Sequence, residues 1–321
     1  MKKVLFIDEK KYRFAHYYEN KSWWIENGVN PIFKDYEKKI NKYKIYSGLL
    51  LNRPDYIVIV QLSTKNLILL QLASLLRIKV IFWQHGVFEY PIIVKAIFKY
   101  LPMKLSSLLA LSEHDIEGIS SIFGEVKSSS VIKHYDLAKL NFSKEEKTED
   151  ELRVAYLGQI VTSKQVYGSG ATIMEKYLGD FDLFNDLIEE IEAKQLPITI
   201  FAKKHPGDKS HYLEELAQRY KCVALAEKDE IFNCDAALSY YSTMMLAFME
   251  LNKPVIQLPM TNGNFRLDLK HYDVNNNLTR VKSTKEFLHL CLNLQSQELE
   301  EVNQNQFQSI SKNLIKVFQG E

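Results

Sequence analysis

Short apolar runs rich in β-branched residues alternate with helical segments along this chain, and this alternation limits the fold more than any other feature. Residues 56–61 (Tyr-Ile-Val-Ile-Val-Gln) form a nearly continuous apolar run, as expected of a strand buried on both faces of a parallel sheet. Residues 66–76 have helical spacing, and residues 79–83 form a second buried strand. A strand, a helix and a strand at this spacing make a βαβ unit, which predicts a parallel sheet.

The alternation begins again after a charged stretch, residues 143–152, which we interpret as an interdomain linker. A chain of 321 residues is longer than one hydrophobic core usually serves, which favours two domains. We therefore predict an α/β protein with two Rossmann-like domains whose parallel sheets face a central cleft. The predicted domains are residues 1–148 and 149–321, and we expect a terminal helix within residues 303–320 to pack back on the first domain.

Composition and charge exclude several classes of protein. The 41 Lys and Arg residues nearly balance 40 Asp and Glu residues, whereas a protein that tracks duplex nucleic acid usually has a basic excess. Cys222, Cys234 and Cys291 are too widely spaced for a disulfide framework or a zinc site and are typical of a reducing compartment. No apolar run reaches the roughly 20 residues of a membrane span. We expect a cytoplasmic protein, at most peripheral on the inner face of the membrane.

The turn after the predicted strand 198–201 has the clearest functional chemistry. The strand leads into Lys203-Lys204-His205-Pro206. Pro206 keeps His205 out of helical space, so the strand ends there with the imidazole at its tip. Ligands bind at strand tips in α/β sheets, and a histidine beside two lysines suits a phosphate or pyrophosphate. The alternative is a basic surface turn.

Two further stretches of the second half follow predicted strands. Tyr241-Ser242-Thr243 precedes a predicted helix, 244–251, where hydroxyl groups and free N–H groups would bind an anion. A plain helix N-cap is the alternative. Gly158-Gln159 follows the strand 153–157, and a glycine at that point lets the backbone approach a ligand closely.

One stretch of the first half ends a strand in the same way. Gln84-His85-Gly86 follows Trp83, and a neutral imidazole there could remove a proton from a hydroxyl group. The alternative is a histidine buried against Trp83. The acidic pair in Asp180-Phe181-Asp182 is interpreted as helix capping because it precedes a helix. No metal site is predicted.

These four stretches together resemble bacterial transferases of the GT-B fold that build cell-surface polymers. The similar families are the CDP-glycerol glycerophosphotransferases and the sialyl- and Kdo-transferases that use CMP-sugars. Their motifs are matched by Lys203-x-His205-Pro206, by the segment 235–243 with Lys253-Pro254, by Leu157-Gly158-Gln159 and by Trp83-Gln84-His85-Gly86. The resemblance covers mostly the second half of the chain.

The resemblance implies a metal-independent, inverting glycosyltransferase of capsule or lipopolysaccharide synthesis that needs no cofactor. The donor would be CMP-sialic acid, CMP-Kdo or a CDP-linked polyol, and the acceptor a glycan or glycolipid hydroxyl. The first domain would bind the acceptor and the second the nucleotide. The implied catalytic residues are His85 and His205; the implied donor-binding residues are Gly158, Gln159, Lys203, His205, Pro206, Tyr241, Ser242 and Thr243; and the implied acceptor-side residues are Gln84, Gly86 and Glu89.

One departure from related enzymes affects the choice of donor. Hexosyltransferases of this fold commonly place a ribose-binding Glu on the helix after the Ser/Thr turn, where this chain has Leu246-Ala247, with Glu250 one turn later. This favours a cytidine nucleotide. The alternatives are a UDP-sugar hexosyltransferase or epimerase of the same fold, and an inactive nucleotide-sugar-binding protein of the envelope.

Residues 90–111 place three lysines among large apolar residues. Such a segment is expected either to lie in a membrane interface near a lipid-linked acceptor or to be a core-facing helix with extended lysines.

Overall fold

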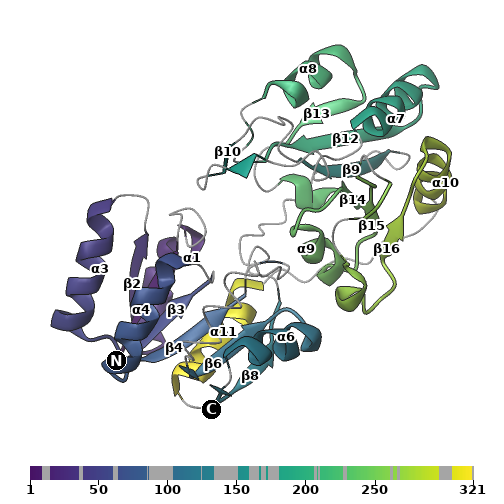
Figure 1. Cartoon of the computed structure of the whole chain (residues 1–321). Helices are drawn as coiled ribbons and strands as arrows, with labels where there is room; N and C mark the ends of the chain where they lie inside the picture. The colour runs from purple at the N-terminus through teal and green to yellow at the C-terminus, as the bar shows by residue number, and fades with distance from the viewer. Residues whose placement is uncertain are drawn as a thin grey trace. The chain divides into compact units, whose positions relative to one another are not determined.

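The computed structural model of the chain forms two compact units (Figure 1). Unit 1 comprises Met1–Lys139 and Asn305–Glu321, and unit 2 comprises Leu140–Gln304. The predicted domain boundary between residues 148 and 149 lies outside the described residues. The structure describes residues 1–8, 15–35, 39–60, 64–84, 86, 104–123, 125–133, 151–158, 166–167, 171–172, 181–205, 208, 210–226, 230–260, 263–265, 268–295 and 306–319.

Unit 1 is built on a parallel sheet of six strands. The first strand in the chain lies inside the sheet, so the chain winds outward in both directions from it. In spatial order the strands are β2 (Val29–Asp35), β1 (Lys2–Asp8), β3 (Tyr56–Ile59), β4 (Lys79–Trp83), β6 (Ser107–Ala110) and β8 (Ser129–Val131). A separate parallel pair is formed by β5 (Lys104–Leu105) and β7 (Glu125–Val126).

The two faces of the unit 1 sheet have separate cores, because successive side chains of a strand point to opposite faces. Leu5 and Ile7 of β1 pack with one group of helices, whereas Phe6 between them contacts Trp24 and Phe318 on the other side. The first group is α3 (Lys39–Asn52), α4 (Thr64–Leu75) and α6 (Glu113–Phe123). The other helices of unit 1 are α1 (Ala15–Glu19), α2 (Lys21–Glu26) and α11 (Gln306–Gln319).

Helix α11 belongs to unit 1 although it follows unit 2 in the sequence. The Phe318 ring lies 5.2 Å from the Tyr56 ring and 6.5 Å from the Phe6 ring, measured between centroids. The Tyr56 hydroxyl donates a hydrogen bond of 3.1 Å to the Phe318 carbonyl oxygen. Phe318 is 1% exposed, so this helix supplies part of the unit 1 core.

Unit 2 is also built on a parallel sheet of six strands, but two strands rather than one lie on one side of its first strand. In spatial order they are β13 (Val223–Leu225), β12 (Ile198–Lys203), β9 (Leu152–Leu157), β14 (Ala236–Ser239), β15 (Val255–Gln257) and β16 (Leu278–Arg280). One core of this sheet includes residues of α7 (Phe181–Ala193), α8 (Tyr212–Arg219) and α10 (Thr284–Gln295). Helix α9 (Met245–Glu250) packs on β14 and β15.

The smaller elements of unit 2 are a hairpin and two single-turn helices. They are β10 (Val166–Tyr167), β11 (Ala171–Thr172), η3 (Glu230–Asn233) and η4 (Lys270–Tyr272). Among the described residues, no helix is long and apolar enough to span a bilayer.

The α/β prediction with two parallel sheets is confirmed, and the predicted buried strands all lie in these sheets. Within the two six-stranded sheets, strands β2 and β16 were not predicted. Both lie at the edge of a sheet, so each pairs with a neighbouring strand on one side only. Pro31 in β2 is compatible with an edge position because it donates no ladder hydrogen bond. Strand β16 is short and half-buried, so its sequence has no continuous apolar run.

Truncation of Phe318 tests whether α11 is part of the unit 1 core. We expect Phe318→Ala to lower the free energy of unfolding by about 3 to 5 kcal/mol, as for other buried aromatic side chains. The exposed Lys312 on the same helix provides a control, since Lys312→Ala should change stability by less than about 0.5 kcal/mol. Urea unfolding followed by circular dichroism measures both. Equal effects of the two substitutions would contradict this packing.

Candidate functional site

The unit 2 sheet has a topological switch point between β9 and β14. From β9 the chain adds β12 and β13 on one side and β14, β15 and β16 on the other. In open parallel sheets, ligands bind beyond the carboxyl ends of the strands at such a point. Gly158 follows β9 and Ser239 ends β14, so two of the sequence motifs meet at the place where the topology predicts a ligand.

Gly158 lies where the backbones of two strands come very close. Its amide donates a 2.8 Å hydrogen bond to the Lys203 carbonyl oxygen at the end of β12. A Cβ atom at position 158 would lie only 2.5 Å from that oxygen and 3.4 Å from the His205 amide nitrogen. Real Cβ atoms do not approach this closely, so any other residue would have to displace the β12 tip. The glycine is therefore required by packing, whether or not a ligand also approaches it.

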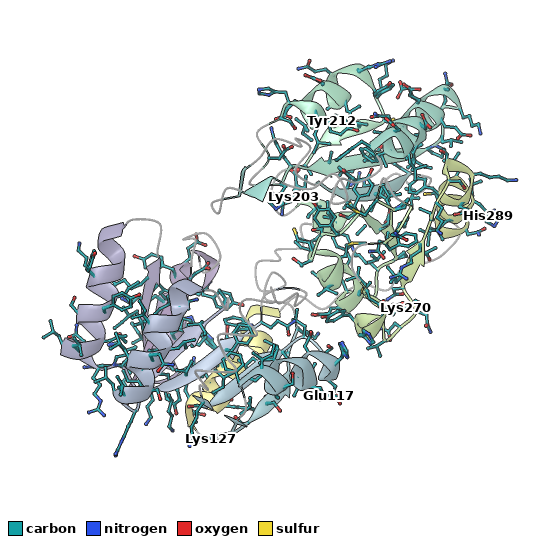
Figure 2. All side chains as sticks on the ribbon, viewed as in Figure 1. Glu117, Lys127, Lys203, Tyr212, Lys270 and His289 are labelled. Carbon is teal, nitrogen blue, oxygen red and sulfur yellow. The ribbon has the colours of Figure 1, made fainter. Side chains whose placement is uncertain are left out.

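Lys203 (labelled in Figure 2) extends from the end of β12 toward the turn before α9. Its Nζ lies 3.5 Å from the Met244 sulfur, and Met244 directly follows Ser242-Thr243. The structure thus brings a half-buried ammonium group to the residue that directly follows two of the predicted donor-binding residues. These groups come from β12 and from the segment after β14, two strands that flank β9.

The turn after β14 is held by side-chain hydrogen bonds to the backbone. The buried Ser239 hydroxyl donates to the Leu157 carbonyl oxygen at 2.9 Å and accepts from the Ser242 amide at 3.3 Å. The Ser242 hydroxyl in turn accepts from the Met244 amide at 3.4 Å. Ser242 therefore shapes the turn, and Thr243, which is half-buried, is the hydroxyl residue at its outer end.

The start of α9 differs from the expected anion site. The amides of Met245 and Leu246 donate to the Ser242 and Thr243 carbonyl oxygens, both at 3.1 Å, and the Ala247 amide donates to the Met244 carbonyl oxygen at 3.0 Å. These are the N–H groups that a helix N-terminus would otherwise offer to a ligand. The expectation of free N–H groups in the first turn is therefore wrong, and cation and hydroxyl side chains are left to bind an anion.

Gln257 and Arg280 fix the same turn from the next two strands. Gln257 is fully buried at the end of β15, and its Nε2 donates to the Tyr240 carbonyl oxygen at 3.3 Å. Its Oε1 accepts from Arg280 Nε at 3.0 Å. These contacts were not predicted from the sequence. The only signal for them is that Gln257 is a polar residue in an otherwise apolar run, residues 254–258, since a buried amide must be hydrogen-bonded.

The two lysines beside His205 have different roles. Lys204 Nζ donates to the Ser210 carbonyl oxygen and pairs with the Glu214 carboxylate of α8 at 2.6 Å. This lysine therefore closes its own loop onto α8. His205 is exposed, and its carbonyl oxygen accepts from the Asp208 amide at 2.9 Å. Of the basic residues in this motif, Lys203 and His205 are positioned at the β12 tip.

The motif around 235–254 divides between the two ends of the sheet. Asp235 Oδ2 accepts a hydrogen bond of 2.8 Å from the Arg153 amide. This bond lies one residue before the first paired residues of β9 and β14, at the amino ends of these strands. Lys253 Nζ donates to the Phe232 and Cys234 carbonyl oxygens at 2.6 and 2.8 Å. These two charged residues hold loops at the amino ends of strands, away from the Ser239–Met244 turn at the carboxyl end.

The aromatic residues of the motifs contribute mainly to packing. Tyr156 is 1% exposed and stacks on Phe184 with ring centroids 4.0 Å apart. Burial raises the pKa of Tyr156 well above its usual value, so its hydroxyl stays protonated. Tyr241 is half-buried against the same core.

In unit 1, the side chain of Gln84, a predicted acceptor-side residue, is hydrogen-bonded to backbone groups. Gln84 is fully buried; its Nε2 donates to the Gly86 carbonyl oxygen and its Oε1 accepts from the Leu111 amide, both at 2.9 Å. Gln84 therefore links the Gly86 backbone to Leu111, the residue just after β6. The predicted residues His85, Glu89, Gln159 and Pro206 lie outside the described residues.

No group of three or more His, Cys, Asp or Glu side chains that could hold a metal ion is found among the residues whose placement the structure describes. Asp182, the second acid of the D-x-D sequence, lies in the first turn of α7.

Comparisons with known proteins identify the fold but not a family. No protein-family model matches the chain, and neither does any curated protein. A putative UDP-N-acetylglucosamine 2-epimerase from Listeria monocytogenes has a TM-score of 0.65 at 9% identity, covering 99% of this chain and 97% of its own. MnaA from S. aureus, in a co-structure with UDP, has a TM-score of 0.64 at 11% identity, covering 100% and 97%. MurG from Acinetobacter baumannii has a TM-score of 0.55 at 10% identity, covering 100% of both chains.

The chain has the GT-B fold, as predicted from its sequence. The matched structures give no support to the resemblance to sialyltransferases or CDP-glycerol glycerophosphotransferases. Identities this low show the fold alone.

Gly158→Ala tests the close approach of the β9 and β12 tips. We expect it to lower the free energy of unfolding by more than about 1 kcal/mol because the Lys203 backbone must move. Gly118 in α6 is the matched control: no atom lies within 4 Å of the place that a Cβ would take there, so Gly118→Ala should stabilise the protein by up to about 1 kcal/mol. Urea unfolding measures both changes. A Gly158→Ala variant that is as stable as the wild type would refute the steric argument.

The Lys204–Glu214 pair should make stability depend on pH. The hydrogen bond from Lys204 is the largest cause of the lowered pKa of Glu214. A carboxyl with a lower pKa in the folded state stabilises the protein above its unfolded-state pKa, and this contribution is lost as pH falls through the folded-state pKa. Since both side chains are about one-third exposed, Glu214→Gln should cost at most about 1 kcal/mol at neutral pH.

Denaturant unfolding of the Glu214→Gln variant at neutral and acidic pH measures this difference, which should disappear in acid. Glu215→Gln, at the exposed neighbouring position, is the control and should show no such change. If Glu214→Gln lowers the free energy of unfolding by the same amount at both pH values, its effect is due to packing and not to the ion pair.

Proposed function

We propose that this chain is an enzyme that acts on a nucleotide-activated sugar, with unit 2 as its nucleotide-binding unit and a UDP-sugar as its substrate. The observation that carries the proposal is the convergence at the switch point of Gly158, the Lys203 ammonium group and the turn that bears Thr243. Several proteins of the same fold are described as UDP-N-acetylglucosamine 2-epimerases or were solved with UDP, which supports uridine as the base.

The proposed chemistry follows from the groups at the β12 tip. A sugar–diphosphate bond that breaks leaves negative charge on the diphosphate, and a fixed cation near that charge stabilises the transition state. Lys203 would supply this cation, and the exposed His205 would donate a second hydrogen bond. The hydrogen bond from Gln257 to the Tyr240 carbonyl oxygen, with Arg280 bound to Gln257 behind it, keeps the turn that bears Thr243 in place before the ligand binds. This preorganisation lowers the cost of ordering the site.

Two reactions are compatible with such a site. Epimerisation of a UDP-N-acetylhexosamine is the first candidate, because it is the activity named for several proteins of the same fold. Glycosyl transfer is the second candidate, favoured by the sequence motifs that resemble transferases. In that case His85, whose flanking backbone Gln84 anchors, is our proposed base for the acceptor hydroxyl group.

Nucleotide binding is tested by thermal unfolding with UDP, GDP, CMP and CDP. Binding to the native state raises stability by mass action, by about 2.7 kcal/mol at a ligand concentration 100 times Kd. We expect UDP to raise the midpoint most. Lys203→Met should weaken UDP binding by roughly 10- to 100-fold, because it removes a charge-assisted hydrogen bond. Lys221→Met, at an exposed position of unit 2, is the control.

Each outcome of this titration discriminates between the candidates. An unchanged UDP response in Lys203→Met would remove Lys203 from the site. Preference for CMP or CDP would favour the cytidine-dependent transferase implied by the sequence motifs, and no response to any nucleotide would overturn the proposal. Incubation with UDP-N-acetylglucosamine alone, followed by NMR, then separates the two reactions, since an epimerase needs no acceptor. Binding without turnover across an acceptor panel would indicate an inactive binding protein.

A further inference from the structure

Helices α3 and α4 of unit 1 present large apolar side chains to solvent. Their inner sides pack on the sheet through Ile45, Leu49, Leu69, Leu70 and Ala73. Their outer sides would ordinarily be polar, because a surface helix is apolar on the core side only. Instead, five large apolar residues are exposed there: Tyr43 (75%), Leu50 (62%), Leu51 (82%), Ile68 (59%) and Leu75 (78%). We call these five residues the α3–α4 outer surface.

The exposed residues of the two helices belong to one surface. Residues 43, 50 and 51 fall on the same side of α3, and residues 68 and 75 are two turns apart on the same side of α4. The Arg53 guanidinium, just after α3, donates a 2.8 Å hydrogen bond to the Leu76 carbonyl oxygen, just after α4. This bond ties together the helix ends that carry Leu51 and Leu75, and Figure 1 shows the two helices as neighbours on unit 1.

The charge of this region is strongly one-sided. Residues 38–79 contain eight Lys and Arg residues and a single acid, Asp55, which leaves 33 basic and 39 acidic residues in the rest of the chain. Asp55 accepts a hydrogen bond from the Lys3 amide at 2.8 Å. The exposed cations next to the outer surface include Lys44, Arg53 and Arg77. The protein is nearly neutral as a whole, but its charge is unevenly distributed, and residues 38–79 are both basic and apolar.

We propose that the α3–α4 outer surface docks unit 1 onto an anionic lipid bilayer. Exposed leucine side chains can enter the acyl boundary while the surrounding Lys and Arg residues contact anionic headgroups. A second copy of the chain is a poorer partner, because pairing this surface with itself brings the cations of the two copies together. Nucleic acid would pair with the Lys and Arg residues but would leave the exposed leucine side chains without an apolar partner. This surface is distinct from residues 90–111, most of which lie outside the described residues.

Vesicle co-sedimentation of the full chain tests the proposal. The wild-type protein should sediment with vesicles of phosphatidylcholine mixed with phosphatidylglycerol, bind pure phosphatidylcholine much more weakly, and lose binding as salt screens the headgroup charge. The double variant Leu51→Gln and Leu75→Gln should bind at least about tenfold more weakly, since two apolar side chains no longer leave water. Lys44→Glu should also weaken binding, by about tenfold.

The matched control is Leu292→Gln, at a 53% exposed leucine of α10 in unit 2, which should bind vesicles as the wild type does. All variants change exposed residues, so their thermal midpoints and their responses to UDP should stay at wild-type values. Absence of wild-type binding to anionic vesicles, or equal binding by the double variant, overturns the proposal. Light scattering tests the alternative that the surface forms a dimer interface. A wild-type protein that is a dimer and does not bind vesicles, together with a double variant that is a monomer, would assign the surface to a second copy of the chain.

Discussion

The β9 and β12 tips lie so close together that no side chain fits between them at position 158. This constraint sets the direction in which β12 leaves the sheet, and with it the positions of Lys203 and His205. On the other side of β9, the Leu157 carbonyl oxygen accepts a hydrogen bond from Ser239, which fixes the start of the next turn. Two successive residues at the end of β9 therefore hold the two segments that form the candidate site.

Most of the polar residues that looked functional in the sequence are bound to the backbone of the protein itself. Lys204, Asp235, Lys253 and Gln84 each hold a loop through carbonyl or amide groups. A buried polar group left without a partner would cost free energy, so such residues must be satisfied internally wherever no ligand reaches them. The number of basic and polar residues in a motif is therefore a poor measure of how many of them could contact a ligand.

The fold could be predicted from the sequence because both sheets are parallel and their inner strands, such as 56–59 and 236–239, are apolar throughout. The edge strands β2 and β16 lack that pattern and were missed. The candidate site was only partly predictable. Lys203 and Gly158 follow from strand ends and local sequence, whereas the contact between Gln257 and Tyr240 joins residues 17 apart through the sheet order. The closure of Lys204 onto Glu214 is likewise a tertiary contact, so the local sequence alone showed two equivalent lysines.

The return of α11 to unit 1 has a consequence for biosynthesis. Unit 2 is one continuous stretch, residues 140–304, and is synthesised completely before the ribosome reaches α11. Unit 1 begins first but lacks Phe318, which covers Phe6 and Tyr56, until that later segment emerges. Phe6 and Tyr56 therefore lack this cover throughout the synthesis of unit 2, and the unit that starts first is completed last. Apolar surface that is exposed during folding is prone to aggregation.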